Sequence, residues 1–226
     1  MIFWIPLIAI LALSGWAQYQ VSHQFRLYSQ RSNRRYLTGA QAAQAVLNTH
    51  GVPGVRIARC AGHLTDHYDP RDNTIYLSQS VYDSATIAAV GVACHEAGHA
   101  CQYAEGYVPI RIRSAIIPAC QIGSSFSYIL ILIGIFLYSQ AWFGLGVLLF
   151  SFTTLFQLVT LPVEFNASRR ALETIEGAGL LYDDEYDGAR KVLRAAALTY
   201  VAALLTSLLY LMQYVLMFIG MGRRDE

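Results

Sequence analysis

Four uncharged, apolar stretches constrain the fold of this chain more than any other feature of its sequence. Residues 115–138, 139–163 and 195–222 contain no Asp, Glu, Lys or Arg, and each is long enough to cross a hydrocarbon core, which takes about 20 residues. Ile2 to Ala17 forms a shorter fourth stretch. Because it lacks a basic segment before it and a small-residue cleavage site after it, we interpret it as a retained anchor. The sequence therefore predicts a mainly α membrane protein with about four transmembrane helices.

The basic residues predict which side of the membrane the connecting segments face. Nine of the sixteen Lys and Arg residues lie between the first and second apolar stretches, and five lie between the third and fourth. Four crossings put these segments on one side, which the positive-inside rule makes the cytosol. We expect a multi-pass protein of the cytoplasmic membrane whose basic face meets the anionic headgroups of the lipid bilayer. Nucleic acid is not an expected partner, because no nucleic-acid-binding motif accompanies the basic residues.

The segment His95-Glu96-Ala97-Gly98-His99 is an H-E-x-x-H motif. Ser84 is a suitable N-cap and Gly106 a suitable stop, so a helix is predicted over residues 85–105. Residues four apart share one face of a helix, which lets both imidazoles reach a single tetrahedral ion.

The residue types of this motif predict zinc-dependent hydrolysis. Zinc takes histidine ligands and keeps an open position for water at catalytic sites. Glu96 lies beside the two histidines, where a carboxylate can take a proton from water that the ion activates. The competing interpretation is an ordinary helix that carries two incidental histidines.

A catalytic zinc site needs a third protein ligand. In metzincins it is a histidine six residues after the second histidine of the motif, and that position is occupied here by Glu105, so this class is excluded. The gluzincin arrangement uses a glutamate from a later helix. Glu164 fits, because it follows Pro162, which suits the first turn of a new helix or a kink where the third apolar stretch leaves the bilayer.

Other interpretations of the same segment stay open. Glu164 can instead be an interfacial carboxylate paired with Arg111 or Arg113. Glu173 and Glu176 lie further along and are expected to be solvated. If Glu164 is the ligand, Asn166 and Ser168 are expected to support it without touching the ion.

Four segments together resemble the YugP-type membrane zinc metallopeptidases: Leu64 to Pro70, Ile75 to Ser78, the H-E-A-G-H-A run, and L-P-V-E-F-N-A-S-R-R-A from Leu161. The resemblance covers most of residues 39–171 and extends to the four-span layout. It implies a neutral zinc peptidase in which His95, His99 and Glu164 bind Zn2+ and Glu96 is the catalytic base. A helical hairpin between the motif and the third glutamate also resembles the membrane proteases of the heat-shock type.

Residues 63–70 and 72–78 predict two short strands around a Pro-Arg-Asp-Asn turn. In gluzincins a strand above the active-site helix pairs with an extended substrate, and we assign this role to Asn73 to Ser78. His67 is a candidate to donate a hydrogen bond to the developing oxyanion. His63 and His67 share one strand face, which leaves a second metal site as an alternative to two structural histidines.

Three further expectations concern packing. Thr38 is predicted to cap a helix over residues 39–49. Gly91 and Gly98 each cost about 1 kcal/mol of helix propensity, so we interpret them as points of close approach, to another helix and to the metal site or substrate respectively. The four cysteines show no C-x-x-C pairing and are expected to be reduced, and the two beside the motif to be buried apolar residues rather than ligands.

These features divide the chain into membrane and cytosolic segments. The expected membrane segments are residues 1–18, 115–163 and 195–222. Residues 19–114 are expected to form a small cytosolic α+β, zincin-like catalytic region, with the H-E-x-x-H helix and a short β-hairpin, and residues 164–194 a cytosolic helical region with the third ligand. The predicted function is a membrane-embedded zinc endopeptidase that cleaves polypeptides at the cytosolic membrane face.

Two other functions remain as alternatives. An intramembrane site-2-type protease adds an Asp-containing ligand segment in a later span, and no Asp occurs between Arg111 and Leu180. A catalytically idle membrane scaffold could keep the metal motif, but it has no chemical need for a buried carboxylate beside two imidazoles.

Overall fold

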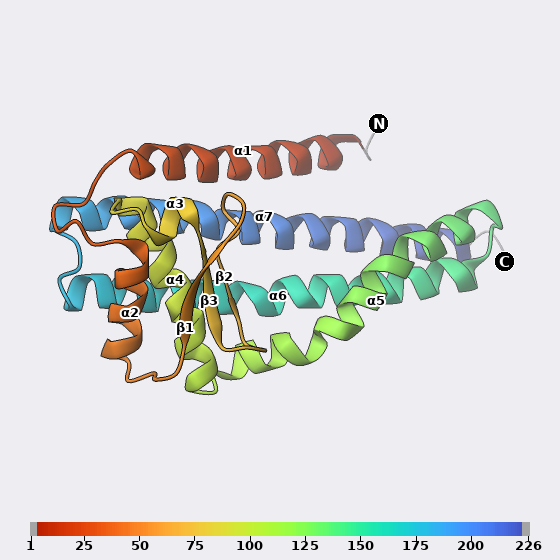
Figure 1. The fold of residues 1–226 in the computed structure, drawn as a ribbon. Coiled ribbons are helices and arrows are strands. Elements are labelled where there is room, and N and C mark those ends of the chain that lie inside the picture. The colour runs from red at the N-terminus through yellow and green to blue at the C-terminus, as the bar shows by residue number, and fades with distance from the viewer. Residues whose placement is uncertain (1–3, 223–226) are drawn as a thin grey trace. The chain divides into compact units, whose positions relative to one another are not determined.

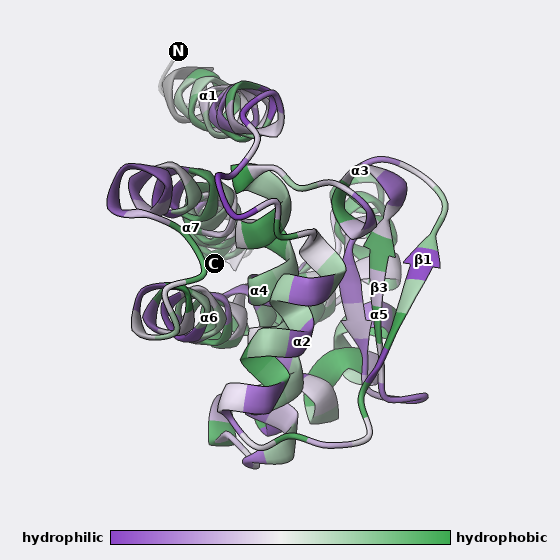
Figure 2. Ribbon diagram, turned by 60° about the vertical axis from the view of Figure 1, so that its left-hand side comes forward, coloured by the Kyte–Doolittle hydropathy of each residue, from purple (hydrophilic) through white to green (hydrophobic). Residues whose placement is uncertain are grey.

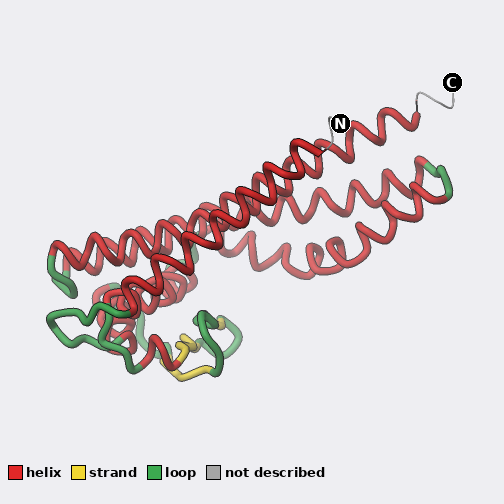
Figure 3. The backbone as a smooth tube through the Cα atoms, turned by 90° about the horizontal axis from the view of Figure 1, so that it is seen from above, coloured by secondary structure: helices red, strands yellow, loops and turns green. Residues whose placement is uncertain are grey.

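The computed structural model describes residues 4–222, and most of them are helical (Figure 1). In chain order the elements are α1 (Trp4–Ser29), α2 (Gly39–Thr49), β1 (Arg56–Cys60), β2 (His67–Asp69), β3 (Thr74–Ser78), α3 (Gln79–Tyr82), α4 (Ile87–Ala104), α5 (Val108–Phe136), α6 (Gln140–Gly177) and α7 (Asp183–Gly222). They form two compact units. We call residues 4–15, 109–162 and 200–222 the helical unit, and residues 16–108 and 163–199 the sheet-containing unit. The strands are gathered in one small region of the chain trace (Figure 3).

Within the helical unit, α5 and α6 form a tight hairpin. Tyr138 turns the chain between them with a φ of 51°. A Cβ on Gly134 would lie 2.4 Å from the backbone nitrogen of Phe143, so the two helices approach each other there as closely as their backbones allow. The Phe143 ring is fully buried at this contact. The hairpin is thus held by close packing at its turn.

Three helices of the described residues are long and apolar enough to cross a membrane: α5, α6 and α7. They contain the three long uncharged stretches of the sequence, and many of their large apolar side chains, such as Leu132, Leu148 and Leu216, are exposed. Such exposure suits a lipid environment. The expected fourth span is not among these helices. From Trp4 onward its residues lie in α1, and Ile2 and Phe3 lie outside the described residues.

The sheet of the sheet-containing unit has the strand order β1-β3-β2. β1 runs parallel to β3 and pairs Arg56 with Thr74, whereas β2 runs antiparallel and pairs His67 with Tyr76. The two predicted strands are therefore present, and β1 is an additional one. Because β3 is paired on both sides, the assignment of residues 73–78 as a free substrate-pairing edge is wrong. The free edges of the sheet belong to β1 and β2.

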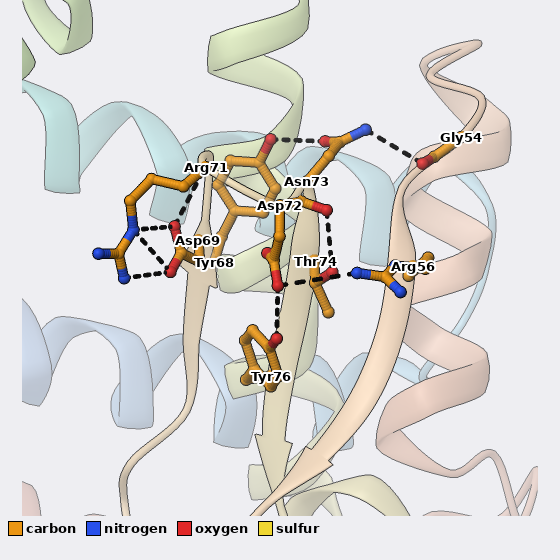
Figure 4. Close-up of polar contacts among 9 residues, drawn as sticks. All are labelled: Gly54, Arg56, Tyr68, Asp69, Arg71, Asp72, Asn73, Thr74 and Tyr76. Carbon is orange, nitrogen blue, oxygen red and sulfur yellow. Dashed lines mark hydrogen bonds and ion pairs between the residues drawn. The ribbon is translucent and has the colours of Figure 1, made fainter.

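The turn between β2 and β3 is closed by polar contacts (Figure 4). Asp69 accepts hydrogen bonds from the backbone nitrogen and the Nε of Arg71, at 2.9 and 3.0 Å. The Tyr68 hydroxyl donates to Asn73 Oδ1 at 2.7 Å, and the Asn73 amide donates to the Gly54 carbonyl at 3.0 Å. We call residues 68–73 the hairpin tip. Its side chains bind one another and the Gly54 carbonyl, and Asp72 also contacts the side chains of Tyr76 and Arg56.

Helix α4 is the central helix of this unit, and most of its residues are buried. It begins after Thr86, whose hydroxyl accepts a hydrogen bond from the backbone nitrogen of Ala89 at 3.3 Å, so the expected cap at Ser84 is wrong by two residues. It ends before Gly106, which has a φ of 67°. Within the unit, α4 lies between α2 on one side and the adjoining parts of α6 and α7 on the other (Figure 2). Its burial makes it a rigid support for the motif that it carries.

The helix predicted over residues 39–49 is α2. The Thr38 side chain accepts from the backbone nitrogen of Gln41, while the Gln41 side chain accepts from the backbone nitrogen of Thr38. This reciprocal capping box satisfies two backbone donors that would otherwise be unpaired at the helix start. The predicted cap is therefore confirmed, and α2 packs its apolar face, including Val46 and Leu47, into the core with α4.

Candidate metal centre

His95 and His99 lie one turn apart on α4, and Glu164 lies on the part of α6 that belongs to the sheet-containing unit. Among the described residues, these three form the one group of His, Cys, Asp or Glu side chains that could hold a metal ion, with all candidate ligand atoms within 4.8 Å of one another. The two imidazole rings are 4.7 Å apart and nearly perpendicular, at 83°. Two segments that are 65 residues apart in the chain thus meet at one point.

The spacing of these atoms suits zinc. Glu164 Oε2 lies 3.2 Å from His95 Nε2 and 3.4 Å from His99 Nε2. A tetrahedral ion with ligands at about 2.0–2.1 Å requires its ligand atoms to be roughly 3.3 Å apart. The three side chains are only 13%, 10% and 4% exposed, for His95, His99 and Glu164. A carboxylate and two imidazoles held this closely away from solvent are a chemically suitable donor set for Zn2+.

Gly98 is what allows α4 and α6 to bring these residues together. A Cβ at this position would lie 2.7 Å from the carbonyl oxygen of Ala167 on α6. A Cβ built on Gly91 would lie 3.4 Å from the Cβ of Ala189 on α7. Gly91 therefore faces another helix, as expected. Gly98 faces the backbone of the helix that carries Glu164, rather than a ligand directly.

Proline does not interrupt this helix. α6 continues through Pro162 as a single helix from residue 140 to residue 177, so of the two expectations for Pro162, a new helical segment or a kink, the first is wrong. Glu164 therefore projects from the interior of a long helix, two residues beyond the proline.

Glu96 lies on α4 beside His95 and is 9% exposed. Burial raises the pKa of the Glu96 carboxyl to about 7, against the opposing effect of His95 and with a further contribution from the negative charge of Glu164. A carboxyl group with a pKa near neutrality exchanges protons readily at physiological pH. The Glu96 carboxylate, placed beside the two histidines, is therefore suited to accept a proton.

The second ring nitrogens of both histidines are also engaged. Ser168 Oγ lies 3.1 Å from His95 Nδ1, and Gln102 Oε1 lies 2.9 Å from His99 Nδ1. Asn166 Oδ1 accepts from the Gln102 amide at 2.9 Å. Ser168 and Asn166 were expected to support Glu164, but their hydrogen bonds lead to the two histidines instead. Sequence reasoning missed Gln102, although a polar side chain three residues after a ligand on an apolar helix was a usable signal.

The structure places His67 on β2 with its ring stacked on Tyr76 at a centroid distance of 5.1 Å. Its Nδ1 lies 2.8 Å from the carbonyl oxygen of Thr65, which can only accept. Nδ1 therefore carries a proton, and Nε2 can donate a hydrogen bond only when the ring is positively charged. His63 packs edge-on against Phe25 at 5.4 Å. Among the described residues, these two histidines do not join the group of side chains that could hold a metal ion.

Cys94 and Cys101 are fully buried on α4, as predicted. Burial raises the pKa of both thiols, that of Cys101 to about 11. Neither belongs to the metal-ligating group found among the described residues. They are packing residues of the helix.

Comparison with known proteins agrees with the resemblance seen in the motifs. The family model described as "Putative neutral zinc metallopeptidase" matches residues 3–219. The "Putative membrane protease YugP" of Bacillus subtilis (strain 168) is 44% identical over 226 residues, which is 100% of both chains. No solved structure matches the chain. With a family model that covers nearly all of its length and a full-length relative at this identity, the chain belongs to this family of neutral zinc metallopeptidases.

Proposed function

We propose that this protein is a membrane-embedded, zinc-dependent endopeptidase, with His95, His99 and Glu164 as the zinc ligands. The observation that carries this proposal is the spacing of 3.2 and 3.4 Å between Glu164 Oε2 and the two histidine Nε2 atoms. The family and the full-length relative named as a membrane protease support it.

The roles of the residues follow from their chemistry. When bound, zinc supplies Lewis acidity, which makes water a better nucleophile and polarises a peptide carbonyl. Glu96 accepts a proton from the attacking water on its carboxylate and delivers it to the leaving amine. Both histidines lie on α4, which is buried on most sides and so holds them in place while Glu96 transfers the proton.

Glu96→Gln tests the mechanism with little change in shape. We expect the purified variant to keep one zinc ion per chain and to lose casein or peptide hydrolysis by about 10²–10⁴-fold, because only the proton acceptor is removed. Glu176→Gln, an exposed change on α6, is the control and should hydrolyse normally. Full hydrolysis by Glu96→Gln would refute the mechanism. A wild-type protein that binds zinc but cleaves nothing would favour the idle scaffold.

The proposed active site lies at the cytosolic membrane face. In this proposal the membrane segments are residues 1–18, 115–163 and 195–222, and the cytosolic segments are residues 19–114 and 164–194. The basic residues concentrate in the cytosolic segments, as the positive-inside rule requires. A single cysteine engineered at residue 140 in a cysteine-free background should be labelled only from outside the cell. Labelling only from the cytosolic side would refute this orientation.

The free edge of β2 is the proposed binding site for an extended polypeptide substrate. β2 packs near α4, with Tyr68 and Tyr103 rings 5.5 Å apart, and the charges of Asp66 and His67 act on Glu96. A substrate strand added at this edge would run past the proposed centre. Backbone N-methylation of a peptide substrate at alternate residues should therefore raise its KM in one register only. Equal KM values in both registers would exclude pairing at this edge.

A further inference from the structure

A chain of four side chains leads from the surface to His99. Arg170 NH1 donates to Glu105 at 2.6 Å, and Arg170 Nε donates to Asn166 Oδ1 at 2.8 Å. The Gln102 amide donates to the same Asn166 oxygen at 2.9 Å and to the carbonyl oxygen of Val163 at 2.8 Å. Gln102 Oε1 then faces His99 Nδ1 at 2.9 Å. Gln102 is fully buried, so the hydrogen bonds that it makes itself are shielded from bulk water.

These contacts fix which end of the Gln102 amide faces His99. The Val163 carbonyl oxygen can only accept a hydrogen bond. Arg170 can only donate, so Asn166 must present its oxygen to it, and that same oxygen faces Gln102. Both neighbours therefore require the NH2 end of Gln102, which leaves its oxygen for His99. An oxygen at this position accepts only from a protonated Nδ1.

We propose that Gln102 is a positioning residue that holds His99 as the Nδ1–H tautomer, with the lone pair of Nε2 directed at the zinc position. This inference rests on the proposed zinc site. His99 Nε2 is the atom that lies 3.4 Å from Glu164 Oε2, and a proton on it would prevent it from binding the ion. His95 lacks an equivalent constraint, because the Ser168 hydroxyl next to its Nδ1 can donate or accept.

Two substitutions at Gln102 separate positioning from general stability. Gln102→Leu removes the acceptor for His99, and zinc affinity should fall about 10–100-fold. Gln102→Glu keeps an acceptor beside Nδ1 but loses both donated bonds, because its carboxylate meets two oxygens. It should bind zinc within a few-fold of wild type while unfolding at a lower temperature. If Gln102 only stabilised the fold, zinc affinity would fall in both variants in proportion to their loss of thermal stability.

The experiment is zinc transfer from the full-length protein in detergent to a chromophoric chelator, with thermal unfolding of the metal-free protein measured alongside. Thr174→Val is the matched control, since it removes a buried hydroxyl on α6 that bonds His50 and the Arg170 carbonyl rather than the ligands. It should leave zinc affinity unchanged. The visible spectrum of the Co2+-loaded protein should change in Gln102→Leu and be kept in Gln102→Glu.

The possible results distinguish a failure of the role proposed for Gln102 from a failure of the proposed zinc site. If Gln102→Leu binds zinc as tightly as wild type, the positioning role is refuted and the zinc site stands. If Gln102→Leu does not fold, Gln102→Glu decides, and a loss of 10-fold or more in zinc affinity for that folded variant refutes the role. If the wild-type protein binds no zinc, or if His99→Ala binds zinc as tightly as the wild-type protein does, the proposed function itself fails.

Discussion

Polar side chains gather around His95, His99 and Glu164 and again at the hairpin tip (Figure 4), but their surroundings differ. At the tip, the Arg71 side chain is 88% exposed and its partner Asp69 is 15% exposed. At the candidate metal centre, no ligand side chain exceeds 13%. Hydrogen bonds of similar length therefore have different energetic value, because water competes for the first set and is excluded from the second.

Asp69 at the hairpin tip and Glu96 beside the candidate metal centre have pKa values shifted in opposite directions. Hydrogen bonds from Arg71 lower the pKa of Asp69 to about 2, whereas burial raises the pKa of Glu96 to about 7. At neutral pH the first carboxyl group is fully charged and inert, and the second is ready to gain or lose a proton. Burial acts on Glu164 in the same way, but hydrogen bonds from His95 and His99 outweigh it and lower the pKa of that carboxyl group. The direction of each shift therefore depends on whether hydrogen-bond donors face the carboxyl group, as well as on its burial.

Removing a ligand should give the largest effect of the comparison. Glu164→Ala should weaken zinc binding by more than about 100-fold, because the ion then lacks its only carboxylate ligand. Chelator competition measures this directly. Glu173→Ala, on the same helix and exposed in an ion pair with Arg169, should bind zinc normally. Equal affinities for the two variants would mean that the buried cluster is no metal site.

Adding one methyl group at the helix crossing should give a smaller effect, on stability. Gly98→Ala places a Cβ against the Ala167 carbonyl, and it should lower the free energy of unfolding by about 1–3 kcal/mol. Gly91→Ala places its Cβ at ordinary contact distance from Ala189, 3.4 Å from its Cβ and 3.6 Å or more from its backbone atoms, and gains up to about 1 kcal/mol of helix propensity. Chemical unfolding of the metal-free variants compares them. A Gly98→Ala protein as stable as Gly91→Ala would show that α4 and α6 separate easily.

The hairpin tip should give the smallest effect. Arg71→Ala removes an exposed ion pair and should change the free energy of unfolding by less than about 1 kcal/mol. Zinc affinity should not change. A destabilisation of several kcal/mol in the same unfolding experiment would mean that the tip contributes to the core, contrary to the comparison drawn here.

Local sequence signals predicted the parts of the structure that depend on near neighbours. Thr38 and Gln41 are three residues apart and formed the expected cap of α2. The candidate ligands were predicted because each belongs to a short motif whose chemistry is specific. The juxtaposition of Glu164 with the two histidines needed the further knowledge that zinc takes three protein ligands.

Contacts between distant segments were harder to predict. β1 pairs with β3 across a connection of 13 residues, and its sequence, Arg-Ile-Ala-Arg-Cys, has weak strand alternation. Missing it made β3 look like an edge strand. Gln102 had one local signal, its position three residues after His99, but its acceptors Val163 and Asn166 lie more than 60 residues away. Local preference could not show that this glutamine would be buried and fully bonded.

Within the sheet-containing unit, Glu164 lies on the same helical segment as Ala167 and Ala171, which are fully buried, so its position depends on how that segment packs. Rotating a helix by one residue turns its side chains by about 100° and shifts them by about 1.5 Å along its axis, whereas zinc tolerates ligand displacements of only about 0.2 Å. The rotation of residues 163–177 of α6 against α4 within this unit therefore determines whether the third candidate ligand is in reach. Zinc affinity would therefore be a sensitive measure of how this part of α6 is rotated about its axis.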